Sequence, residues 1–125
     1  MSIVTSRGLN ENMLPGLSHR TLAGPEHGLH GLAVWSQRIE PNAATPPHRH
    51  DCDEVVLCQS GRGELHVDGQ VQAFAAHSTL VLPRGRLHQI LNTGGTPLEV
   101  IGVFGATPVG TFLLDGQALA LPWRS

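Results

Sequence analysis

The sequence predicts an all-β protein, and two observations carry this prediction. From about residue 18 onward, short apolar runs alternate with turn-forming residues, in the pattern typical of a β-sandwich or barrel. The chain holds 15 Gly and 9 Pro, while charged residues make up only 14% of it, so many turns and few amphipathic helices are expected. A length of 125 residues suits one domain. We therefore expect a single barrel domain over residues 19–125, with a C-terminal tail, preceded by an N-terminal arm over residues 1–18.

Each predicted strand is bounded by a turn signal. The run over residues 30–40 ends at Pro41-Asn42, and the run over residues 53–60 ends at Gly61. Residues 63–74 form a predicted hairpin, because the Asp-Gly pair at positions 68 and 69 favours the positive-φ turn that matches strand twist. No segment has the pattern of a helix. Further strands are expected over residues 78–83, 87–92, 97–106 and 109–114.

Charge and composition exclude several classes of function. A net charge of −2 gives no broad attraction to nucleic acid or to an anionic membrane, and no run approaches the roughly 20 apolar residues of a membrane span. The N-terminus lacks the basic start and apolar run of a signal peptide. Cys52 and Cys58 fit no metal-knuckle spacing, so we interpret them as free thiols in a reduced, cytoplasmic protein. No nucleic-acid or membrane partner is therefore expected.

Histidine is unusually abundant, with eight residues against eight Lys plus Arg. His48 and His50 are two apart, so on an extended segment both side chains point to one face and could share a metal ion. A straight strand would carry Glu54 about 13 Å beyond His50, so residues 51–53 must turn if Glu54 is a further ligand. Asp at positions 51 and 53 suits such a turn. A cation would neutralise this charged cluster beside the apolar strand that follows it.

A further histidine lies in a second segment of similar character. His88 comes after a tight turn at residues 83–85, on an otherwise apolar strand. Taken alone, a histidine in such a place is more often a hydrogen-bonded core residue than a metal ligand. The presence of both segments in one chain favours ligation.

Together these two segments resemble the two signature motifs of the cupin superfamily. The first motif is His, any residue, His, three or four residues, Glu, six residues and Gly, and residues 48–61 satisfy it at every spacing. The second is Pro, any residue, Gly, two residues, His, three residues and Asn, and residues 83–92 satisfy it. The order and separation of the motifs are similar to those of small single-domain bacterial cupins of the conserved-barrel (cupin 2) type. Asn42 and His77 stand where that family often has turn glycines, and we expect both to occupy turns.

The resemblance implies a double-stranded β-helix, the jelly-roll cupin barrel, with a metal bound inside it. It also implies a homodimer, in which the N-terminal arm could cross to the partner. The outward-facing Val55 and Leu57 suggest a second sheet or a second subunit above them. The metal would be one divalent transition ion per chain, and Fe, Mn, Ni, Cu and Zn all suit the ligand types. The implied metal ligands are His48, His50, Glu54 and His88.

Other polar residues are candidates for the barrel interior. Gln37 and Arg38 face opposite ways on one strand, so one of them is expected to face inward, where it could orient a substrate. Asp51 and Asp53 either orient the histidine ligands or only hold the turn. The remaining side chains of interest are interpreted first as surface, core or dimer-contact residues: His19, His27, His30, Trp35, Cys58, His66, His77 and Phe104. The less favoured alternatives are that one of the three N-terminal histidines caps the barrel mouth and that His66 or Cys58 lines the cavity.

Three classes of function stay open. The first is a metal enzyme acting on a small organic substrate, either a dioxygenase or an isomerase, lyase or polyketide cyclase, with Glu54 as a catalytic residue. We favour dioxygenase chemistry within this class, on family analogy. The second class is a module that binds a small ligand without turnover. The third is a storage or structural role, and the complete ligand set argues against it.

Overall fold

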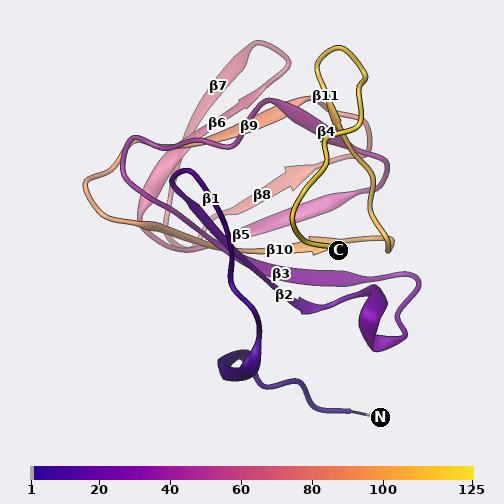
Figure 1. The fold of residues 1–125 in the computed structure, drawn as a ribbon. Helices are drawn as coiled ribbons and strands as arrows, with labels where there is room; N and C mark the ends of the chain where they lie inside the picture. Colours follow the sequence, from indigo (N-terminus) through magenta and orange to yellow (C-terminus); the bar gives the residue numbers. More distant parts are fainter. Residues whose placement is uncertain (1) are drawn as a thin grey trace.

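Two antiparallel β-sheets face each other and enclose the interior of the protein (Figure 1). The structure is a computed structural model that describes residues 2–125. The six-stranded sheet has the order β1-β2-β3-β10-β5-β8, and the five-stranded sheet has the order β11-β4-β9-β6-β7. This is a jelly-roll arrangement, so the predicted all-β barrel is confirmed.

The strand bounds follow the predicted runs closely in the second half of the chain. The six-stranded sheet contains β1 (Asn12–Leu14), β2 (Leu17–Ala23), β3 (Ala33–Ile39), β10 (Leu98–Phe104), β5 (Glu54–Ser60) and β8 (Thr79–Leu82). The five-stranded sheet contains β11 (Thr111–Leu113), β4 (His48–His50), β9 (His88–Asn92), β6 (Arg62–Val67) and β7 (Gln70–Ala75). Two short 3₁₀ turns, η1 (Ser6–Gly8) and η2 (Pro25–His27), complete the elements. Within residues 2–125, no helix has the length and apolar character needed to cross a membrane.

The core lies between the sheets, where alternate side chains of each strand point inward. On β10, Leu98, Val100 and Phe104 point inward and are buried. The residues that alternate with them point to the other face and are half-buried. Gly102 lies opposite Trp35 in the β10–β3 register, and a Cβ on this glycine would fall 2.0 Å from the Trp35 ring. The glycine therefore leaves room for the indole inside the barrel.

The turns confirm the local predictions. Val67 pairs with Gln70 across the β6–β7 hairpin, and Asp68 (φ 50°) and Gly69 (φ 79°) take the positive-φ conformation between them. Asn42 (φ 67°) and His77 (φ 71°) also have positive φ. Both therefore lie in turns, as predicted, in the left-handed conformation that favours glycine.

The N-terminal segment is more structured than its composition indicates. Residues 12–14 form β1, which pairs with the start of β2, and β2 in turn pairs with β3 at the edge of the six-stranded sheet. The sequence predicted neither strand, and the expected boundary at residue 18 falls inside β2. Residue 1 of the predicted arm lies outside the described residues. Val55 and Leu57 are half-buried on the outer face of β5, and the predicted homodimer stays a prediction.

The crossing between the two sheets positions the candidate site. β4 belongs to the five-stranded sheet and β5 to the six-stranded sheet, so the chain passes from one to the other over residues 51–53. His48 lies directly opposite His88 in the β4–β9 pairing. Side chains that are close in the sequence thus reach the interior from two opposing walls.

Candidate metal centre

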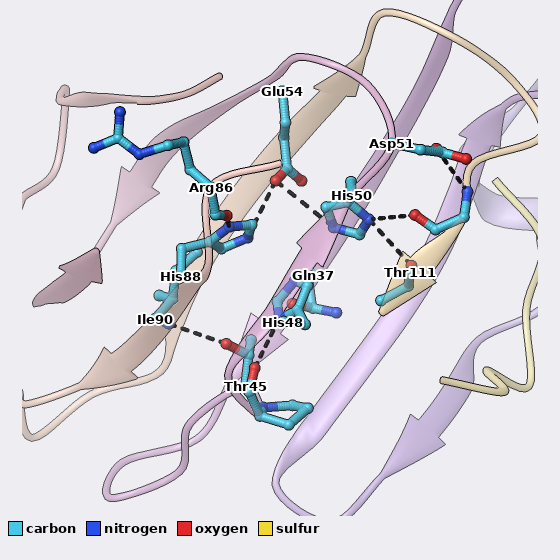
Figure 2. Close-up of polar contacts among 12 residues, drawn as sticks. Gln37, Thr45, His48, His50, Asp51, Glu54, Arg86, His88, Ile90 and Thr111 are labelled. Carbon is cyan, nitrogen blue, oxygen red and sulfur yellow. Dashed lines mark hydrogen bonds and ion pairs between the residues drawn. The ribbon is translucent and has the colours of Figure 1, made fainter. Parts of the chain in front are cut away.

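Three imidazole rings converge inside the barrel, two from β4 and one from β9 (Figure 2). The ring centroids of His48 and His88 are 4.3 Å apart, and those of His48 and His50 are 4.8 Å apart. One nitrogen from each of the three rings lies within 4.8 Å of the others. A single cation placed among these nitrogens could be shared by all three histidines.

Glu54 reaches the same point from β5, in the opposite sheet. Its Oε1 lies 3.4 Å from Nε2 of His88 and 3.8 Å from Nε2 of His50 (Figure 2). The residue is 5% exposed, and Oε1 has no hydrogen-bond partner among the described residues. Leaving a buried carboxylate oxygen without a partner is costly, and coordination to a cation removes that cost. The four residues therefore fit a metal ion, which would give the unpaired oxygen of Glu54 a partner.

Each imidazole is held by a hydrogen bond on the side away from the cluster. Nδ1 of His48 lies 2.6 Å from the carbonyl oxygen of Pro46, and Nδ1 of His88 lies 3.0 Å from that of Arg86. Nδ1 of His50 lies 3.2 Å from the carbonyl oxygen of Gly110. A carbonyl can only accept, so each Nδ1 carries the proton and donates it. Each Nε2 is then left with a lone pair for a metal.

Burial also favours the neutral form of these rings. Burial, and after it the neighbouring His88 and His50, lower the pKa of His48 to about 4. Burial and then His88 lower the pKa of His50 to about 4 as well. A histidine must be neutral to ligate, so both rings are ready for a metal at neutral pH.

The structure therefore brings together all four residues that the sequence proposed as ligands: His48, His50, Glu54 and His88. The predicted turn after His50 is also present. Within it, Asp53 Oδ1 accepts the backbone N–H of Arg84 at 2.8 Å, and Asp51 Oδ1 accepts that of Gly110 at 2.9 Å.

A cavity of about 170 Å³ adjoins the four residues, which form part of its lining. Most of its remaining wall is apolar and comes from distant parts of the chain. The wall side chains include Leu14, Trp35, Phe104, Leu121 and Trp123. Trp35 and Phe104, interpreted from the sequence as core residues, are both buried in the core and exposed to the cavity.

The inward-facing member of the Gln37 and Arg38 pair is Gln37. It is 9% exposed and lines the cavity, whereas Arg38 lies on the outer face in ion pairs with Glu40 and Glu99. The sequence predicted that one of the two would face inward, and the structure decides which.

His19 is a cavity residue that the sequence analysis did not favour as part of the site. It is 3% exposed and stacks between two indoles, with ring centroids 3.9 Å from Trp123 and 5.6 Å from Trp35. Its burial lowers the pKa of the imidazole to about 3. The favoured interpretation placed His19 outside the site, whereas the structure places it in the cavity wall. The only local signal, an alternation over residues 17–23, is weak because polar residues interrupt it.

The other polar candidates stand apart from the site. His66 lies beside Glu64 at 3.1 Å in a half-exposed pair, and His77 is exposed in its turn. Cys52 and Cys58 are free and buried, and burial raises the pKa of both thiols. They behave as small core side chains rather than as reactive groups.

Comparison with known proteins places this site in a family. The family profile described as "Auxin binding protein" matches residues 8–122. The chain is 35% identical over 111 residues to auxin-binding protein 1 of Arabidopsis thaliana, which covers 81% of this chain and 56% of that protein. It is 37% identical over 116 residues to auxin-binding protein T92 of Nicotiana tabacum, covering 83% of this chain and 62% of that protein. The chain thus spans about three fifths of the length of these relatives.

The fold comparison agrees with the signature motifs. A sugar phosphate isomerase of the cupin superfamily from Silicibacter pomeroyi superposes with a TM-score of 0.76 at 22% identity, covering 91% of this chain and 82% of that one. This likeness confirms the cupin fold and nothing narrower. The sequence resemblance was to small bacterial cupins, whereas the family profile is that of auxin-binding proteins and these two relatives come from plants. The chain belongs to the auxin-binding protein family of the cupin superfamily.

Proposed function

We propose that the protein is a metal-dependent binding protein for a small organic acid of the auxin type. His48, His50, Glu54 and His88 would hold the metal, and the acid would bind beside them in the cavity. One observation carries the proposal: three imidazole nitrogens and an unpaired carboxylate oxygen converge in a cavity whose wall is largely apolar. The curated relatives named above are auxin-binding proteins, which supports the choice of ligand.

Charge balance is the reason for choosing an acid. Three neutral imidazoles and one carboxylate leave a divalent cation with one uncompensated positive charge. In a cavity of low dielectric constant such a charge is costly, so an anionic ligand group is favoured there. When bound, the metal supplies the positive centre that attracts the carboxylate.

The cavity wall is the reason for choosing an acid with an apolar body. Trp35, Phe104 and Trp123 supply flat apolar surfaces, and burying a ligand against them contributes about 25 cal/mol per Å² of apolar area. Gln37 supplies an amide inside this wall, which can orient a polar atom of the ligand. A small aromatic or aliphatic carboxylic acid combines both requirements.

The enzyme hypotheses are less well supported. Neither the family profile nor the curated relatives carry a name that indicates dioxygenase chemistry, which was the favoured hypothesis from sequence. Glu54 as a catalytic proton carrier remains the second hypothesis, because its Oε1 is buried without a hydrogen-bond partner among residues 2–125. The choice among Fe, Mn, Ni, Cu and Zn stays open, since three imidazoles and a carboxylate suit each of them.

Isothermal titration calorimetry of the metal-loaded protein tests the proposal. We expect indole-3-acetic acid, an auxin, to bind, and its neutral amide, indole-3-acetamide, to bind at least tenfold more weakly because it brings no charge to the metal (about 1.4 kcal/mol or more). Removal of the metal should lower the affinity for the acid to that for the amide. Equal affinity for acid and amide, or acid binding that survives metal removal, would contradict the proposal.

A matched pair of variants locates the binding to this cavity. Glu54→Gln removes one proposed ligand, whereas His66→Ala removes a histidine that lies outside the cavity beside Glu64. We expect loss of metal and acid binding in Glu54→Gln and unchanged binding in His66→Ala. The same loss in both variants would place the metal elsewhere.

A further inference from the structure

We propose that Asp51 is a positioning residue that sets the orientation and protonation of the metal ligand His50 by fixing the backbone of Gly110. The proposal rests on the proposed metal site and adds a residue to it. Asp51 does not face the metal itself. It acts through one backbone segment, residues 109–111, which lies far from it in the sequence.

His50 differs from the other two histidines in how it is held. The carbonyl partners of His48 and His88 are Pro46 and Arg86, each two residues earlier in the same segment. Local chain geometry is therefore sufficient to orient those two rings. The carbonyl partner of His50 is Gly110, which is 60 residues away in the sequence. The orientation of His50 depends on whatever holds Gly110 in place.

Asp51 holds Gly110. Its Oδ1 accepts the Gly110 N–H at 2.9 Å, while the Gly110 carbonyl oxygen faces Nδ1 of His50 at 3.2 Å (Figure 2). The β4–β11 pairing places Thr111 directly opposite His50. Two adjacent residues of the bend, His50 and Asp51, thus bind the two backbone groups of a single glycine. The result is a closed loop of contacts with the metal ligand as one member.

The close approach of Asp51 explains why position 110 is a glycine. A Cβ there would lie 2.7 Å from Asp51 Oδ2 and 2.9 Å from the ring of Phe112. Any larger residue would push the carboxylate or the strand away and lengthen the contact. The small residue and the acidic residue therefore form one matched pair.

Thr111 is a second hydrogen-bond partner of His50, and it makes the contact between the Gly110 carbonyl and His50 decisive for which ring nitrogen carries the proton. Its Oγ1 lies 3.1 Å from the same Nδ1 of His50. A hydroxyl can donate as well as accept, so Thr111 alone is compatible with a proton on either ring nitrogen. The Gly110 carbonyl can only accept, and it therefore keeps the proton on Nδ1 and leaves Nε2 free to bind a metal. If Gly110 moves, the Thr111 hydroxyl can donate to Nδ1 and leave Nε2 protonated.

Three variants separate this role from general effects of charge and folding. Asp51→Ala removes the acceptor for Gly110, and Asp51→Asn keeps an acceptor oxygen but removes the charge. Asp53→Ala is the control, because Asp53 lies in the same bend but accepts the N–H of Arg84 instead. Circular dichroism melting checks that each variant is folded.

Two measurements follow on these proteins. The first is Zn²⁺ affinity by competition with a chelating dye, where we expect a loss of about tenfold or more for Asp51→Ala. We expect Asp51→Asn and Asp53→Ala to stay within about threefold of the wild type. The second is ¹⁵N NMR of the histidine rings in the metal-free protein, which reports the protonated nitrogen. We expect Nδ1–H for His50 in the wild type and a growing share of Nε2–H in Asp51→Ala.

Several outcomes would overturn the proposal. One is wild-type Zn²⁺ affinity in Asp51→Ala, and another is an equal loss in Asp51→Asn, which would make the effect one of charge. An equal loss in Asp53→Ala would show a general disturbance of the bend. A third test is the double variant Asp51→Ala/Thr111→Val, which should show a smaller share of Nε2–H than Asp51→Ala alone because the competing donor to Nδ1 is gone; an undiminished share would contradict the account. If the wild type binds no Zn²⁺, the proposed function fails, and the metal-free NMR comparison still decides the role of Asp51.

Discussion

Oε1 of Glu54 lies 3.4 Å from Nε2 of His88, although the two residues come from strands in opposing sheets. The carboxylate therefore enters the histidine cluster from the far wall of the barrel. Its buried Oε1 has no hydrogen-bond partner in the described part of the chain, so the metal-free protein leaves this polar oxygen unpaired inside the barrel. The site therefore lowers the free energy of unfolding when it holds no cation and raises it when a cation is bound.

Glu54→Gln is therefore expected to change stability in opposite directions in the two states. Without metal, the variant should be more stable than the wild type by about 1–3 kcal/mol, because a glutamine amide can donate to the lone pair on Nε2 of His88, where the wild type leaves Oε1 without a partner. With metal, the variant should be less stable, because a ligand is lost. Urea unfolding of both proteins, with and without one equivalent of Zn²⁺, measures the four values. A variant that is less stable than the wild type in both states would contradict this reading of Glu54.

Metal removal from the wild type is expected to lower its melting temperature. A ligand present at about 100 times its dissociation constant stabilises the folded state by about 2.7 kcal/mol, which corresponds to roughly 10 °C for a domain of this size. Differential scanning calorimetry before and after dialysis against a chelator measures the change. His88→Ala serves as the control, and its melting temperature should not respond to the chelator.

Stability is expected to fall as the pH is lowered, in part because of His19. Burial lowers the pKa of His19 from 6.5 to about 3, so between these values the unfolded state binds a proton that the folded state does not. The contribution of His19 is thus fully present above pH 6.5 and is lost progressively as the pH falls towards 3, by up to about 1.4 kcal/mol per pH unit. His48 and His50 act in the same direction in the metal-free protein.

The contribution of His19 to this pH dependence is measured by comparing the slope of stability against pH in the wild type and in a His19 variant. His19→Asn removes this titration, so the metal-free variant should lose stability less steeply than the wild type between pH 6 and 4.5 (both within the window set by the His19 pKa values). Urea unfolding at several pH values gives the two slopes. Identical slopes would show that His19 titrates normally and is not buried between the indoles.

Trp123→Ala is expected to separate ligand binding from metal binding. Trp123 lines the cavity and stacks on His19 at 3.9 Å, but it is not among the proposed metal ligands. Its removal should lower the affinity for indole-3-acetic acid by about tenfold, the loss typical of an aromatic residue in a binding wall, and should leave the metal content unchanged. Calorimetry and elemental analysis of the same preparation measure both quantities. Unchanged acid affinity would remove Trp123 from the binding wall.

The convergence of His48, His50 and Glu54 could be predicted from sequence because their pattern is local. His48, His50 and Glu54 fall within one short segment, where a period of two and a forced bend determine the geometry. Likewise, the Asp68-Gly69 turn carries its own backbone preference. Each of these conclusions depends on residues that are neighbours in the chain, and the structure confirms the backbone they imply.

The wall of the cavity could not be predicted, because it depends on contacts between distant segments. His19 belongs to β2, whose alternation is interrupted by polar residues, and Trp123 belongs to a tail without periodicity. On β3, only the register of the sheet decides which alternate side chains face inward. The sequence alone therefore could not decide whether Gln37 or Arg38 lines the cavity. Gly110 and Asp51 are adjacent only because β11 pairs with β4.

Elemental analysis of protein purified without an affinity tag tests the central claim most directly. The wild type and His88→Ala are measured side by side after identical reconstitution with Zn²⁺ and removal of free metal. The account predicts about one equivalent per chain in the wild type and less than about one tenth of that in the variant, since loss of a ligand typically costs far more than tenfold in affinity. Equal metal content in the two proteins, or none in either, would show that the four residues are not a metal centre.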